Sequence, residues 1–166
     1  ADVAEAGDHK ARWFRRMKEQ GLRVKLALDG EGRVGGMIHY LPIERSPAVG
    51  QGLEFILCVW VHGHARGRGD LQGRGMGTAL LEAAEADARA RGVKGLAAWG
   101  LALPFWMRAS WFRRHGYRRA DRRGVAALVW RARVTSARLP FTIPIRFTRA
   151  ARALPDTDPN APEPSA

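Results

Sequence analysis

A chain of 166 residues is long enough for one domain with a hydrophobic core and short for two. Its hydrophobic content of 46% excludes disorder throughout, and its single cysteine, Cys58, excludes an internal disulfide and a cysteine-based zinc cage. The longest apolar run, Phe55 to Val61, is too short to span a bilayer, and no signal peptide is readable. We therefore predict a cytoplasmic protein with no membrane segment and no metal.

The net charge of +12 comes mainly from clustered arginines. Seven arginines and one aspartate lie between Arg108 and Arg123, and six arginines and no acid lie between Arg131 and Arg152. Such a surface attracts polyanions. Three interpretations remain open: a nucleic-acid partner, a phosphate-rich ligand, or a solvated face in an arginine-rich proteome. Nucleic acid is not favoured, because aromatic and basic residues do not alternate as they do in RNA-binding modules.

The first part of the chain predicts a helix, a hairpin and a buried strand. An amphipathic pattern predicts a helix over residues 8–20. Period-two alternation predicts a strand over 23–28, which a glycine turn connects to a returning strand over 33–41. The apolar run over 53–61 predicts a central strand that is buried on both faces.

The second part continues with a long helix over 78–91, a strand over 93–101 and a short helix over 104–115. A final hairpin is predicted over 117–133. Because strands joined through helices pair in parallel and hairpin strands pair antiparallel, the fold class is α/β, a three-layer α/β/α sandwich with a mixed, mostly antiparallel sheet.

The end of the chain differs in composition from this domain, which we assign to residues 1–134. Residues 135–154 form a basic extended arm in which 139–147 is at best an edge strand or docking segment, because it holds two prolines. Residues 155–166 are rich in proline and poor in apolar residues, which predicts a disordered tail.

A glycine-rich loop, Gln72-Gly-Arg-Gly-Met-Gly-Thr78, joins the buried strand region to the long helix. Its glycines allow close approach of a ligand, the helix start adds a positive dipole end, and Arg74 adds a charge, which together suit a pyrophosphate. The alternative is a plain glycine-rich helix start. A P-loop is excluded because Gly-Lys-Ser/Thr is absent, and the spacing is wrong for a dinucleotide fingerprint.

The same loop resembles the Gln/Arg-x-x-Gly-x-Gly/Ala signature of GCN5-related N-acetyltransferases (GNAT). The segment Trp111-Phe-Arg-Arg-His-Gly-Tyr117 resembles the later segment of that family, Leu-Tyr-Glu-Lys-x-Gly-Phe. The resemblance covers roughly two thirds of the chain and implies a GNAT-like fold with acetyl-CoA as cosubstrate. It implies that acetyl-CoA is held by Val59, Trp60, Val61, Gln72, Gly73, Arg74, Gly75, Met76, Gly77 and Thr78.

The resemblance also implies catalytic roles. Glu54, four residues before Cys58, corresponds to a glutamate that acts as general base in the histone acetyltransferase branch. The alternative is a strand-edge carboxylate that faces water or pairs with a nearby arginine. The backbone N–H of Cys58 is then the oxyanion donor. The usual tyrosine acid is replaced by Phe112, so reprotonation of the thiolate falls to water, Ser110 or another group. By simple alternation, Glu54, Ile56, Cys58 and Trp60 are predicted to share one face.

Other features leave alternatives open. An insertion, His62 to Leu71, is either a flap that offers His62 or His64 as a base or a surface insertion. The start of the chain is short by family standards, so a partner subunit or a homodimer completes the site, or the chain is a fragment. The aromatic residues form either core or the wall of an acceptor cleft: Trp99, Phe105, Trp106, Trp111 and Phe112.

The sequence thus predicts an acyl-CoA-dependent N-acyltransferase that transfers an acetyl group from acetyl-CoA to an amine by direct attack. The alternative is a non-catalytic subunit or regulatory module of the same fold that binds CoA, a partner protein or RNA through its arginine-rich face.

Overall fold

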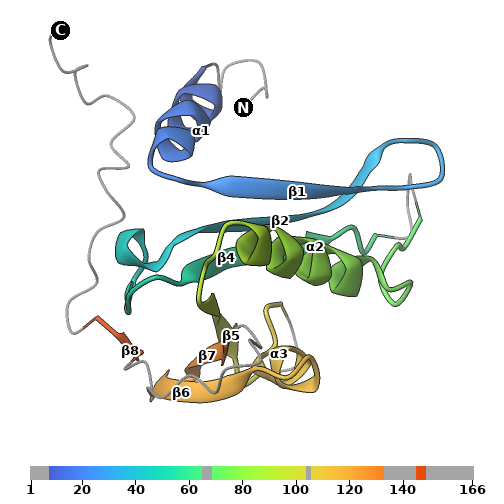
Figure 1. Ribbon diagram of the computed structural model, residues 1–166. Helices are drawn as coiled ribbons and strands as arrows, with labels where there is room; N and C mark the ends of the chain where they lie inside the picture. Colours follow the sequence, from blue (N-terminus) through green and yellow to red (C-terminus); the bar gives the residue numbers. More distant parts are fainter. Residues whose placement is uncertain (1–7, 65–68, 104–105, 133–144, 149–166) are drawn as a thin grey trace, which may run out of the picture.

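A computed structural model describes residues 8–64, 69–103, 106–132 and 145–148 of the chain. Its centre is a six-stranded sheet in which β4 and β5 pair in parallel and all other neighbouring strands pair antiparallel (Figure 1). The strands in spatial order are β1 (Arg23–Leu28), β2 (Val34–Pro42), β4 (Glu54–Val61), β5 (Gly95–Leu101), β7 (Ala126–Ala132) and β6 (Arg118–Arg123). This confirms the predicted mixed, mostly antiparallel sheet.

Helices and a small second sheet cover the two faces. Helices α2 (Met76–Ala90) and α3 (Ala109–Arg114) pack on one face, where Leu80, Leu81 and Phe112 join a common apolar cluster. Helix α1 (His9–Glu19) packs through Met17 on the other face. That face also holds the 3-10 turn η1 (Ile43–Arg45) and the strands β3 (Ala48–Val49) and β8 (Arg146–Phe147). The three-layer architecture is therefore confirmed.

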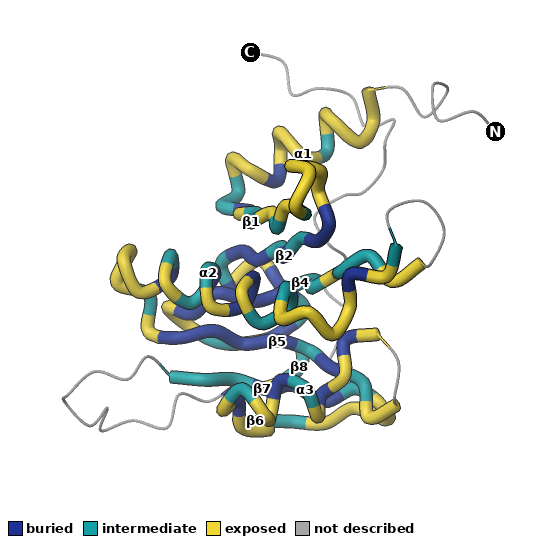
Figure 2. The backbone as a smooth tube through the Cα atoms, turned by 90° about the vertical axis from the view of Figure 1, so that its right-hand side faces the viewer, coloured by how far each residue is buried: buried dark blue, intermediate teal, exposed yellow. Residues whose placement is uncertain are grey.

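Strand β4 is the buried centre that its sequence predicts. Phe55 and Ile56 are both fully buried, Ile56 beneath α2 and Phe55 on the opposite face. Figure 2 shows by colour that buried stretches lie in the central strands of the sheet. A run of apolar residues is needed here because both faces of the strand are covered.

A β-bulge interrupts β4 at Leu57. On β2, Tyr40 lies opposite Ile56 but its neighbour His39 lies opposite Cys58, so β4 carries one extra residue. Bulges break the strict alternation of side chains. The prediction that Glu54, Ile56, Cys58 and Trp60 share one face is therefore wrong. Glu54 and Ile56 face α2, whereas Cys58 and Trp60 face away from it.

Strands β4 and β5 diverge just after the bulge. Their parallel pairing is limited to Glu54–Ile56 against Leu96–Ala98. Beyond it, the indole Nε1 of Trp99 donates to the carbonyl oxygen of Leu57 at 2.9 Å, and the backbone N–H of Val59 donates to the Sδ atom of Met107 at 3.3 Å. Side chains thus satisfy backbone groups that a straight sheet would pair.

The segment before α3 is extended, so the predicted helix over 104–115 starts too early. Met107 has a positive φ of 53° and Arg108 has extended backbone angles, and helix geometry begins only at Ala109. Arg108 instead forms a parallel bridge with Leu101 at the end of β5. Residues 104 and 105 lie outside the described residues.

Of the predicted basic arm, only residues 145–148 are described, and they include β8. Strand β8 pairs antiparallel with β3, and the N–H of Thr148 donates to the carbonyl oxygen of Pro47 at 3.0 Å. The predicted tail over 155–166 lies outside the described residues. No helix in the described part of the chain is both long and apolar enough to cross a bilayer.

Gly100 allows the segment before α3 to lie against β5, which yields a test of this packing. A Cβ atom at Gly100 would lie 2.8 Å from the backbone nitrogen and Cα of Ala109. We expect Gly100→Ala to lower the free energy of unfolding by about 1–3 kcal/mol, the usual cost of overpacking. Gly30→Ala is the control, because nothing lies within 4 Å of that position. Denaturant titration of both variants measures the difference, and equal stability would contradict the packing described.

Candidate functional site

A cavity of about 570 Å³ opens where β4 and β5 diverge. Three parts of the chain line it: the end of β4 over Val59–Val61, the glycine loop with the start of α2, and the segment from Trp106 to Phe112. Nine of the ten residues predicted to bind acetyl-CoA line this cavity, and Arg74 is the exception. The structure therefore brings together residues that are far apart in the sequence.

Hydrogen bonds hold the glycine loop against the end of β4. The amide Nε2 of Gln72 donates to the carbonyl oxygen of Val61 at 3.3 Å, and the N–H of Gln72 donates to the carboxylate of Asp70 at 2.8 Å. The N–H of Leu71 donates to the carbonyl oxygen of His62 at 3.0 Å. The loop is thus fixed directly beside the opening in the sheet.

The loop geometry requires glycine and leaves the start of α2 accessible. Gly73 and Gly75 have φ values of 73° and 82°, which side chains other than hydrogen disfavour. A Cβ atom at either position would meet nothing within 4 Å, so the space above them is open. Gly75 is the N-cap of the 15-residue helix α2 and supplies no side-chain cap. Free N–H groups and the helix dipole therefore face the cavity, as an anion requires.

A hydrogen-bond relay joins the start of α2 to α3. The Nδ1 atom of His115 lies 2.9 Å from the carbonyl oxygen of Trp111, so Nδ1 carries the proton and donates. The Nε2 atom of the same ring lies 3.0 Å from the hydroxyl oxygen of Thr78, within hydrogen-bond distance. In the sequence, His115 stood out only as part of the family segment. Its contact with Thr78 joins residues that are 37 positions apart in the chain, so it was not predictable from the local sequence.

The structure does not place Glu54 at this cavity. Glu54 is 2% exposed and lies at the start of β4, whereas Val59–Val61 at the end of the strand line the cavity. Its Oε1 atom accepts from Nη1 of Arg91 at 2.6 Å. Burial raises the pKa of the Glu54 carboxyl, and the Arg91 guanidinium opposes that shift. This placement supports the structural alternative, a carboxylate paired with arginine, and argues against a general base.

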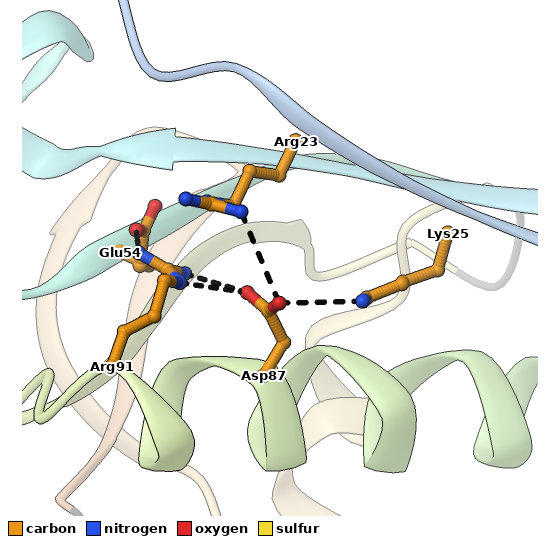
Figure 3. A network of polar contacts seen from close by, with 5 residues as sticks. All are labelled: Arg23, Lys25, Glu54, Asp87 and Arg91. Carbon is orange, nitrogen blue, oxygen red and sulfur yellow. Dashed lines mark hydrogen bonds and ion pairs between the residues drawn. The ribbon is translucent and has the colours of Figure 1, made fainter.

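Glu54 belongs to a polar network that ties α2 to the sheet (Figure 3). Arg91, just after α2, also contacts the carboxylate of Asp87 at 2.8 Å. Asp87 in turn accepts from Lys25 on β1 at 3.3 Å and lies 4.0 Å from Arg23. Two carboxylates and three cations thus join α2, β1 and β4.

The other two predicted catalytic groups also lie elsewhere. The N–H of Val59 points toward β5, so by alternation along the strand the N–H of Cys58 points toward β2. Val59, rather than Cys58, therefore offers its backbone donor to the opening. Burial raises the pKa of the Cys58 thiol, which disfavours a nucleophilic thiolate. Ser110 is exposed on the side of α3 that faces away from the cavity.

The aromatic residues divide between core and cavity. Trp106, Trp111 and Phe112 line the cavity, although Phe112 is fully buried and also belongs to the core. Trp106 is 51% exposed and packs edge-to-face against Trp99, with ring centroids 5.3 Å apart. Phe105 lies outside the described residues.

His39 is a titratable group that the sequence did not single out. It lies directly opposite Cys58 on the face of β2 that α2 does not cover, and it is half-buried. Burial lowers the pKa of His39, so the neutral imidazole is favoured. The register of β2 against β4, with its bulge, places His39 opposite Cys58, on the side of β4 away from β5.

Comparison with known proteins identifies the fold. No protein-family profile matches the sequence, and no curated protein matches it. Solved structures do match. The PaiA N-acetyltransferase from Thermoplasma acidophilum in complex with coenzyme A superposes with a TM-score of 0.55 at 12% identity, over 72% of this chain and 66% of that chain.

Two further structures agree. A GNAT-family N-acetyltransferase from Escherichia coli in complex with CoA has a TM-score of 0.55 at 17% identity, over 85% of this chain and 76% of that chain. An acetyltransferase of the GNAT family from Staphylococcus aureus has a TM-score of 0.53 at 12% identity, over 80% of both chains. The chain therefore has the GNAT fold, as the glycine loop and the order of elements predicted.

The placement of Glu54 yields a test. We expect Glu54→Gln to lower the free energy of unfolding by about 1–3 kcal/mol, because it removes the buried partner of Arg91. The affinity for acetyl-CoA should stay within twofold of wild type, since Glu54 is remote from the cavity. Glu82→Gln, on the exposed side of α2, is the matched control and should change neither quantity. Denaturant titration measures the stability, and calorimetry measures the affinity. A large loss of affinity in Glu54→Gln would show that Glu54 belongs to the binding site.

Proposed function

We propose that this chain is an acyl-CoA-dependent N-acyltransferase that transfers an acetyl group from acetyl-CoA to an amine by direct attack. One observation carries the proposal. A single cavity joins the uncapped start of α2, which suits a pyrophosphate, to the backbone N–H of Val59, which suits an oxyanion.

The donor fits this cavity in two parts. The pyrophosphate lies on the glycine loop, where Gly73 and Gly75 leave open space and the N–H groups that begin α2 point outward. The pantetheine arm lies along Val59–Val61, where the divergence of β5 removes the neighbouring strand. This path leads the thioester toward the opening at Val59.

The chemistry needs a neutral amine and a place for developing negative charge. The amine nitrogen attacks the thioester carbon and forms the C–N bond, and the carbonyl oxygen becomes an oxyanion. The Val59 N–H donates to this oxyanion in exchange for Met107, whose thioether is a weak acceptor. A preorganised backbone donor of this kind lowers the barrier by about 3 kcal/mol. Cleavage of the C–S bond then releases the CoA thiolate. The nitrogen loses one proton as the amide forms, and transfer of a proton to the thiolate completes the reaction.

His39 is the base that we assign to the ammonium of the acceptor. It lies opposite Cys58, the neighbour of Val59 on β4, on the face of the sheet that α2 does not cover. A base must be unprotonated when the acceptor arrives, and the lowered pKa of His39 favours that state near neutral pH. The imidazole takes one proton from the ammonium, which leaves the amine lone pair free to attack.

A non-catalytic subunit of the same fold remains the second candidate, and one observation favours it. Among the cavity-lining residues that the structure describes, Arg108 is the only one with a titratable side chain. A protein that only binds a ligand needs no general acid or base in its cavity. The two functions differ in a simple measurement, because only the enzyme releases free thiol from acetyl-CoA in the presence of an amine.

Calorimetry with acetyl-CoA, followed by a thiol-release assay over a panel of primary amines, tests the proposal. We expect saturable binding and amine-dependent release. Gly77→Leu places a side chain in the cavity, where a Cβ atom alone still fits 3.6 Å from Trp111, and should weaken acetyl-CoA binding at least tenfold. Ala79→Leu, two residues later on an exposed position of α2, is the control. Binding without release favours the subunit, and absence of binding contradicts both functions.

A pH profile tests His39. Because its pKa is lowered, His39 is unprotonated above that value, so kcat/KM should stay level as pH falls to about 6.5, the usual histidine pKa, and drop only below it. We expect His39→Gln to lower kcat at least tenfold, with acetyl-CoA affinity unchanged, and to abolish this acid limb. His9→Gln, on α1, is the control. An unchanged profile in His39→Gln would assign the base to another group.

A further inference from the structure

The cations of the chain differ in whether carboxylates neutralise them. On the α2 side, Arg91 contacts Glu54 and Asp87, and Arg131 contacts Glu85 at 3.1 Å. Among the described arginines that form no ion pair, Arg113, Arg119 and Arg122 line the same part of the surface. Other arginines without an ion pair, such as those of α1, lie elsewhere on the surface, so what distinguishes these three is that they lie together.

These three arginines line one depression of about 170 Å³ between α3 and the β6–β7 hairpin. Ser110 also lines it, and its remaining wall is apolar, with Ala127 and Val129 from β7. No acidic residue is among the residues that line it. Three guanidinium groups around one hollow repel each other unless an anion lies between them.

The local structure aims these side chains at one point. Ser110 and Arg113 are three residues apart on α3 and so lie on the same side of the helix. On β6, Arg119 and Arg122 would lie on opposite faces of a regular strand. An extra residue between Arg119 and Asp121 shifts the register, so that both arginines lie opposite residues of the α3-facing core, Val129 and Ala127.

The same bulge turns the nearest carboxylate, that of Asp121, away from the depression. Asp121 lies opposite Leu128, whose side chain belongs to the cluster on the other face of the sheet. Its Oδ2 atom accepts from the N–H of Phe147 at 2.9 Å. Arg122 donates its Nε to the carbonyl oxygen of Gly124 at 2.8 Å, which fixes the guanidinium and leaves its two terminal NH2 groups to donate.

We propose that this depression is a binding site for one phosphate group, carried as a monoester or a diester. Arginine forks and a hydroxyl match the several acceptor oxygens of a phosphate, and the apolar wall accommodates the group that bears it. The site is separate from the cavity between β4 and β5, because Trp111 and Phe112 face that cavity while Ser110 and Arg113 face the depression. It does not depend on the proposed acyl transfer.

Calorimetric titration of the full chain with phenyl phosphate at low salt tests the proposal. We expect saturable binding with one site per chain. Arg119→Gln/Arg122→Gln should weaken it at least tenfold without changing the melting temperature by more than a few degrees, because both side chains are exposed. The control is Arg12→Gln/Arg15→Gln on α1, which removes the same charge from exposed positions outside the depression and should stay within twofold.

Two further ligands identify the source of the phosphate. If a single-stranded oligonucleotide also loses tenfold in Arg119→Gln/Arg122→Gln and not in the control, the phosphate is that of a nucleic-acid backbone. If only phenyl phosphate responds, it is a free monoester. The proposal is overturned if phenyl phosphate does not saturate, or if both double variants weaken binding equally, which indicates general charge attraction. It is also overturned if Arg119→Gln/Arg122→Gln loses acetyl-CoA affinity, because the depression then belongs to the cavity.

Discussion

The divergence of β4 and β5 is the constraint on which the candidate site depends. Parallel pairing ends at Ile56, and a sheet that opens in this way leaves backbone groups without partners. Two side chains from the β5 side replace the missing strand. Trp99 donates to the carbonyl of Leu57 through a rigid indole, whereas Met107 accepts from Val59 through a weak acceptor. The contact of Trp99 fixes the opening. The contact of Met107 is weak, so a stronger acceptor can replace it and bind the N–H of Val59.

The bulge at Leu57 decides which side chains meet at that opening. Val59 and Val61 pack with the α2-side core, on the side where the glycine loop lies. Cys58, with His39 opposite, faces the other side. In the proposed reaction, a donor held by the loop and an acceptor deprotonated by His39 approach β4 from opposite faces of the sheet.

The parts of this site that were predictable from sequence are those with a local cause. Glycines at 73 and 75 before a helix require positive φ and expose N–H groups whatever the rest of the chain does. Pairing of Glu54 with an arginine was one of the alternatives, but its partner Arg91 was not predictable, because it lies 37 residues further on. The position of His39 was not predictable either, because one inserted residue in another strand, Leu57, brings it opposite Cys58.

The same physical device shapes the surface near α3. One extra residue in β6 turns Arg119 and Arg122 to the same side, and it turns Asp121 to the other. The arginines of the fold differ in whether carboxylates neutralise them. Beside α2, the carboxylates of Glu54, Glu85 and Asp87 are 3–17% exposed and pair with Arg91 or Arg131, because an unpaired carboxylate at that depth is costly. Arg119 and Arg122 are exposed, so water tolerates their charges without an ion pair, and these charges can serve the proposed phosphate site.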